Sequence, residues 1–267
     1  KMDYTQVTSA KVQAGPQYKI SETCVGFCDV AIYKELTQGT DFKWTVQEYF
    51  QHSLYASNNI KVTFTGHDTA KVDVTSTQGK VLLNGMVRGL TGDTTITAPK
   101  GIASLSDQAV IVAQNLKLSA QSGAIGSATA PVRIDLTDTD AARGLVNGSL
   151  TALARDGVAI EETDGDLRVA AAQATAGALN LTADRHLLTT DPNVVLQGTD
   201  VRLVSRTGTL GTAASPLRID TSVNGVLSAE AAGDIQITEV SGNLRVQQVR
   251  SRAGDVVLNV PTGSLID

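Results

Sequence analysis

Apolar and polar residues alternate along short stretches of the chain from residue 65 onward. Because side chains at every second position lie on one face of a strand, each apolar pair predicts a strand with one buried face. Glycine, aspartate, asparagine, serine and proline separate the pairs, and these residues favour turns. The sequence thus predicts many short strands, on the pairs Val72/Val74, Val110/Val112, Leu116/Leu118, Val132/Ile134, Val158/Ile160, Leu167/Val169, Leu179/Leu181, Val201/Leu203, Leu217/Ile219, Ile235/Ile237, Leu244/Val246 and Val256/Leu258.

Two segments of this body are copies of each other. "SGAIGSATAPVRID" at 122–135 and "TGTLGTAASPLRID" at 207–220 share half of their fourteen positions. A second pair aligns without gaps, "GSLTALARDGVAIEETDGDLRV" at 148–169 with "GVLSAEAAGDIQITEVSGNLRV" at 225–246. We infer a repeat of roughly 80 residues, with copies at about 115–199 and 200–267, the second of them truncated.

The absence of aromatic residues decides between β architectures. All ten aromatic residues lie at or before Phe64. A sandwich or a propeller needs large side chains or blade markers that this body lacks, whereas aliphatic ladders fill the narrow interior of a parallel β-helix. We therefore predict an all-β fold in which residues 61–267 form a right-handed parallel β-helix (solenoid), the hand following the usual preference of crossovers. At roughly 20–28 residues per coil this gives a rod about 40–50 Å long.

The remaining composition excludes some partners. The chain has 22 basic and 27 acidic residues and a net charge of −5, which argues against nucleic acid. It has no run of about 18 apolar residues, so we expect no membrane insertion. The aromatic residues of segment 1–60 indicate a cap that closes one end of the solenoid, a junction with a preceding domain, or a binding surface built from Trp44, Tyr49 and Tyr55.

Several segments of the sequence resemble a known family. Four segments are similar to the β-helical repeat region of giant secreted bacterial adhesins, namely "GDIQITEVSGNLRV", "SRAGDVVLNVPTGSLID", "GAIGSATAPVRID" and "NNIKVTFTGHDTAKVDVTSTQGKVLL". These are the filamentous-haemagglutinin-like and leukotoxin-type filamentous adhesins, and the resemblance covers roughly residues 60–267. It implies an extracellular shaft at the cell surface, used for attachment, filament building or biofilm.

Two acidic clusters carry candidate chemistry. Relative to the second copy, the first has about eight extra residues after Asp135, including "LTDTDAAR". Asp135, Asp138 and Asp140 could gather around Ca²⁺, or the segment is a solvated loop without an ion. The cluster "EETDGD" at 161–166 indicates a turn, since its counterpart "TEVSGN" keeps only Glu239.

The cysteines allow a second structural site. Cys24 and Cys28 predict a local disulfide in an extracellular protein, with two free buried thiols as the alternative. A zinc site would need further ligands, and the three histidines show no matching spacing.

The repeat also bears on catalysis. Arg133/Arg218 and Arg168/Arg245 recur at equivalent repeat positions, which indicates an architectural role, because a catalytic residue need occur only once. We expect them on neighbouring strands, with Asp135, Asp220, Glu162 and Glu239 as exposed partners of about 0–1 kcal/mol each.

We therefore expect no enzyme and no cofactor other than the candidate Ca²⁺. The predicted function is a structural segment of a large surface fibre, with adjoining domains of the same protein, neighbouring fibre subunits or cell-surface glycans as partners. A polysaccharide-binding or polysaccharide-cleaving β-helix and a self-assembling sheath or filament subunit are the alternatives.

Overall fold

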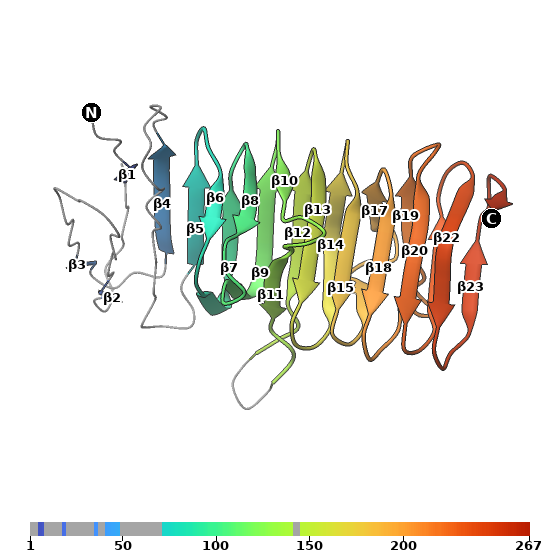
Figure 1. The fold of residues 1–267 in the computed structure, drawn as a ribbon. Coiled ribbons are helices and arrows are strands. Elements are labelled where there is room, and N and C mark those ends of the chain that lie inside the picture. The colour runs from blue at the N-terminus through green and yellow to red at the C-terminus, as the bar shows by residue number, and fades with distance from the viewer. Residues whose placement is uncertain (1–4, 8–17, 20–34, 37–40, 49–70, 141–144) are drawn as a thin grey trace.

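A computed structural model describes residues 5–7, 18–19, 35–36, 41–48, 71–140 and 145–267. Within these residues the protein is all β without a helix, and parallel strands stack into a β-solenoid of about 9 turns (Figure 1). No helix long and apolar enough to cross a membrane occurs among them. The expected all-β parallel β-helix is confirmed.

Each coil of the solenoid has two long sides, which we call side A and side B. From residue 157 onward the chain runs along the two sides in turn, and most strands pair in parallel with strands of the coils before and after them. Side A carries β6 (Val81–Leu83), β8 (Gly101–Ser104), β10 (Ala124–Ile125), β11 (Val132–Leu136), β13 (Gly157–Glu162), β15 (Leu179–Ala183), β18 (Val201–Ser205), β20 (Val226–Ala231), β22 (Leu244–Ser251) and β24 (Leu265–Ile266).

Side B carries β5 (Lys71–Ser76), β12 (Ser149–Ala154), β14 (Leu167–Ala174), β16 (Leu187–Thr189), β17 (Val195–Gly198), β19 (Leu217–Thr221), β21 (Ile235–Glu239) and β23 (Val256–Asn259). Two longer strands, β7 (Val87–Thr97) and β9 (Val110–Ala120), run from side A to side B, because their first halves pair with side A strands and their second halves with side B strands.

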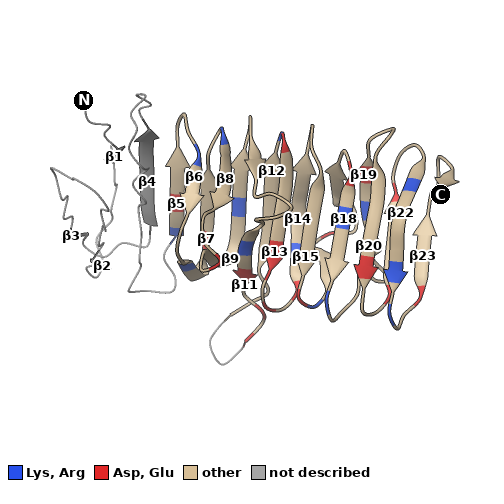
Figure 2. Cartoon of the chain, in the orientation of Figure 1, with Lys and Arg blue, Asp and Glu red and all other residues tan. Residues whose placement is uncertain are grey.

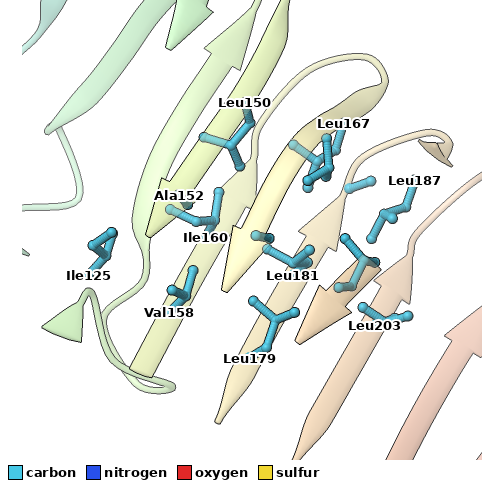
Figure 3. Packing of buried hydrophobic residues seen from close by; sticks show 14 of the residues in the cluster. Ile125, Leu150, Ala152, Val158, Ile160, Leu167, Leu179, Leu181, Leu187 and Leu203 are labelled. Carbon is cyan, nitrogen blue, oxygen red and sulfur yellow. The ribbon is translucent and has the colours of Figure 1, made fainter. Parts of the chain in front are cut away.

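Columns of inward aliphatic side chains form the core. Val158 on β13 pairs with Leu179 on β15, which pairs with Val201 on β18, so these two coils take 21 and 22 residues. Two positions along each strand, Ile160 and Leu181 form the next column (Figure 3). Most of the buried hydrophobic residues make one cluster from Leu83 to Leu244. Burial of each such side chain contributes about 1.5–3 kcal/mol, so the stacked coils stabilise one another.

A short motif marks the corners where one side turns into the next. It is a small residue followed three positions later by glycine, and where the small residue is serine, its Oγ accepts the glycine N–H at 2.8–3.0 Å. At Gly177 a Cβ atom would lie 2.0 Å from the carbonyl oxygen of Asp156, so only glycine lets the coils approach there. The motif occurs at Ser76/Gly79, Ala98/Gly101, Ala120/Gly123, Ala154/Gly157, Ala174/Gly177, Ser205/Gly208 and Ser251/Gly254.

The two copies of the sequence repeat lie on opposite sides of the solenoid. Their offset is 77 residues between Gly148 and Gly225, which spans three coils and about half of a fourth. A strand of side A in the first copy therefore has its counterpart on side B in the second, as β13 and β21 show. Local structure is preserved despite the change of side, since Gly126 and Gly211 have φ angles of 66° and 67°.

The expected ladder of repeat arginines is wrong for the same reason. Arg133 lies on β11 of side A and Arg218 on β19 of side B. Arg168 on β14 and Arg245 on β22 are likewise on opposite sides. Because the repeat spans half a coil more than a whole number of coils, equivalent arginines lie on opposite sides. A repeat of a whole number of coils would have stacked them on one side.

The N-terminal segment does not support the expected aromatic-rich cap. Its described residues are the strands β1 (Thr5–Val7), β2 (Tyr18–Lys19), β3 (Glu35–Leu36) and β4 (Asp41–Glu48). β4 pairs in parallel with β5, with Trp44 opposite Val74, and β1 pairs antiparallel with β4. Cys24, Cys28, Tyr49 and Tyr55 lie outside the described residues, so the disulfide and the aromatic binding surface stay predictions.

Candidate functional site

The extra residues of the first repeat copy form an arm that leaves the solenoid. This arm, residues 137–147, connects β11 to β12, and its described limbs, 137–140 and 145–147, extend past the end of β11 (Figure 1). Its two limbs are tied together at the base, since Gly148 N–H donates to Thr137 O at 2.6 Å and Thr137 Oγ1 donates to Val146 O at 2.9 Å. Further out, Asp140 and Leu145 form an antiparallel bridge.

An apolar contact holds one limb of the arm against the outer surface of the solenoid. Leu145 packs on Leu90 of β7 and Val112 of β9, and all three side chains are buried. This small cluster is separate from the main core, because the core lies on the inner face of the same strands. The second repeat copy has only the turn Ser222–Asn224 at the place of the arm.

A network of charges holds the other limb. Asp138 Oδ1 accepts Arg168 Nη1 at 3.0 Å, and Asp138 Oδ2 pairs with Arg185 Nη2. Asp166 completes the network through Arg168 Nη2 at 2.6 Å and Arg185 Nε at 3.5 Å. Gly165 makes room for it, since a Cβ atom there would lie 2.5 Å from Asp138 Oδ2 and the φ angle is +93°.

The arm thus bridges several coils. From its own coil, Leu145 reaches back two coils to Leu90, and Asp138 reaches forward two coils to Arg185. Ordinary strand pairing joins only neighbouring coils. The arm is therefore positioned as a lateral projection with a rigid base, anchored by apolar contact on one limb and by two guanidinium groups on the other.

The charge of Asp138 should matter for this anchoring. We expect Asp138→Asn to lower the free energy of unfolding by about 1 kcal/mol, because Arg168 and Arg185 lose one of their two carboxylates while Asp166 remains. Limited proteolysis within residues 137–147 should become faster. The control is Asp156→Asn, whose pair with Arg155 at 3.5 Å is exposed on both partners. Equal protease resistance of both variants would contradict the anchoring role.

Two glutamates that we expected on the surface are buried in the core. Glu162, at the end of β13, and Glu239, at the end of β21, are both 0% exposed. Glu162 accepts the N–H of Leu136 at 3.1 and 3.2 Å, directly before the arm. Glu239 accepts the N–H of Thr221, the last residue of β19, at 3.1 Å. The expectation failed because these carboxylates occupy inward positions, where they replace a backbone acceptor at a strand end.

The surroundings of both carboxyl groups disfavour ionisation. Burial raises the pKa of Glu162 from 4.5 to about 9, aided by the negative charge of Asp135 and opposed by the donated N–H groups. Burial likewise raises the pKa of Glu239 from 4.5 to about 7. The repeat therefore preserves this arrangement in both copies, with and without the arm.

The structure separates the three aspartates of the candidate calcium site. Burial and the charges of Asp164 and Asp138 raise the pKa of Asp135, against the influence of Arg88. Asp138 is paired with two arginines, and Asp140 lies farther out on the arm. In the described part of the chain no three His, Cys, Asp or Glu residues group as metal ligands. Calcium stays a prediction that this geometry does not favour.

The acidic residues at the ends of β11 and β13 are visible beside the arm (Figure 2). Residues 163–166 make a turn there, as expected from "EETDGD". Sequence reasoning missed Arg185 as the partner of Asp138, since the two residues are 47 positions apart. The extra length of the first copy was the one signal that pointed to this place.

No family model matches the sequence, and comparisons with curated proteins and with solved structures give no significant match. The resemblance to filamentous adhesins thus stays a prediction.

Proposed function

We propose that this chain is a structural segment of a large extracellular fibre or adhesin, in which the solenoid is a stiff shaft and the arm a lateral contact. The observation that supports this most is the unbroken core from Leu83 to Leu244, in which every coil packs on the next. Such a stack resists bending, because any bend must open strand pairs and expose aliphatic side chains. The partners are adjoining domains of the same protein, neighbouring fibres or cell-surface glycans.

The arm supports the contact role because the bases of its two limbs are held in place against the solenoid. A contact residue that is positioned before binding loses less conformational entropy when the partner arrives. In the described part of the arm, Val146 is 52% exposed and directly follows Leu145, which pairs with Asp140. An exposed apolar side chain on a fixed base fits a partner surface that offers apolar area, such as a glycan.

The test is attachment of particles that display this chain. A variant in which residues 137–147 are replaced by the Ser222–Asn224 turn of the second copy keeps the solenoid, because that turn closes the same strand end in β19–β20. We expect the wild-type chain to promote attachment to cells or glycan-coated surfaces and the variant to lose most of it. Equal attachment by particles that carry the wild type, the variant and no protein would contradict the proposal.

A further inference from the structure

We propose that Glu162 and Glu239 are pH-sensitive latches, each of which holds a strand end of the preceding coil while protonated and opens that strand end when ionised. In the first copy the strand end is the base of the arm, so the latch also sets how firmly the arm is held. In the second copy the same latch closes a plain turn. The inference does not depend on the fibre function.

The positions of the two side chains carry this inference. Glu162 pairs with Ile134 of the coil before, and Glu239 pairs with Ile219, so each carboxyl group stands in a column of inward aliphatic side chains. Both are fully buried. Their hydrogen-bond donors are neutral, namely the N–H groups of Leu136 and Thr221 and the hydroxyl of Thr221, which donates to Glu239 Oε2 at 3.2 Å.

The charged groups around Glu162 do not compensate a negative charge on it. Asp135 on β11 and Asp164 in the following turn are acidic, and Asp164 N–H reaches Glu162 Oε1 only at 3.5 Å. The basic groups of the neighbouring elements are engaged elsewhere. Arg168 and Arg185 pair with Asp138 and Asp166, and Arg88 on β7 acts on Asp135.

Glu239 has a simpler environment. The charged group that acts on it is Asp220 on β19, which is itself acidic and accepts the hydroxyl of Ser241 at 2.8 Å. An ionised carboxylate in either site would be a buried charge facing another acid. Such a charge is costly, and the cost is relieved when the strand end opens and water reaches the carboxylate.

The direction of the pH effect follows from proton binding. Between pH 4.5 and about 9 the folded chain holds a proton on Glu162 that the unfolded chain has lost. The unfolded state binds fewer protons in this window, so stability falls as the pH rises through it. For Glu239 the window runs from 4.5 to about 7. Below 4.5 both states are protonated and the effect vanishes.

Thermal unfolding of the whole chain at several pH values tests the latches, with Glu162→Gln and Glu239→Gln as variants. Glutamine keeps the shape and the acceptor oxygen but cannot ionise. We expect the melting temperature of each variant to equal that of the wild type near pH 4. As the pH rises, the melting temperature of the variant should exceed that of the wild type by a growing margin. The difference should level off near pH 9 for Glu162→Gln and near pH 7 for Glu239→Gln, after a shift of several degrees.

The matched control is Glu161→Gln, one residue away, whose carboxylate pairs with Arg206 at 2.6 Å on the surface. Its melting difference should be small and should not grow above pH 5. In the wild type, cleavage of residues 137–147 by a broad-specificity protease should rise between pH 6 and 9, but not in Glu162→Gln. Melting differences that stay constant with pH, or equal cleavage in both proteins, would overturn the proposal.

Discussion

Leu181→Asp should prevent the central coils from stacking and lower the free energy of unfolding by more than any surface change. Leu181 is fully buried between Ile160 of the coil before and Leu203 of the coil after. Truncation of such a side chain alone costs about 2–5 kcal/mol, and a carboxylate in its place adds the cost of a buried, unpaired charge. A domain of ordinary stability has about 5–15 kcal/mol in total, so we expect loss of the cooperative melting transition.

The measurement is thermal unfolding followed by circular dichroism, together with limited proteolysis. Asn180→Asp is the matched control, because Asn180 precedes Leu181 on β15 and lies on the outer face opposite Arg202. It introduces the same side chain and should change stability by less than about 0.5 kcal/mol. Similar losses in both variants would mean that the alternation of inward and outward positions on β15 is not as described.

Gly177→Ala should destabilise the protein by about 3 kcal/mol, at the upper end of what overpacking usually costs. The added Cβ would lie 2.0 Å from Asp156 O and 2.3 Å from its carbonyl carbon. Both atoms belong to the backbone of the neighbouring coil, so no side chain can rotate to relieve the clash. The φ angle of Gly177 is not in the left-handed region, and the whole effect is therefore steric.

The control for this change is Ala176→Val, which adds two carbon atoms at the adjacent exposed position of the same corner. We expect it to alter stability by no more than about 0.5 kcal/mol. Chemical denaturation of the two variants gives the comparison directly. If Gly177→Ala unfolds at the same denaturant concentration as the wild type, the coils do not approach each other closely at this corner.

The local alternation of apolar and polar residues predicted much of the fold. The pairs Val158/Ile160 and Leu179/Leu181 are both inward-facing, as alternation predicts, because a strand exposes every second side chain to the same face. The corner motif of a small residue and a glycine three positions later was present in the sequence but unrecognised. Its meaning depends on the backbone of the next coil, which approaches Gly177 from 21 residues away at Asp156.

The candidate site was much less predictable. The length difference between the repeat copies marked the arm, yet its anchors, Leu90 and Arg185, are far from it in sequence. Glu162 and Glu239 looked like surface acids because acidic residues are mostly exposed. They are buried because their strands end where a backbone N–H of the preceding coil needs an acceptor, and alternation alone cannot show that.

The sequence by itself determined that the body is a stack of short strands with aliphatic inward faces and small residues at the corners. Both properties depend on neighbours along the chain. Only the tertiary structure decided which residues share a column. A repeat of three and a half coils places its copies on opposite sides, and this phase depends on the length of every coil and loop between them. The same register decided that Leu145, Asp138 and the buried Glu162 each hold the base of one arm.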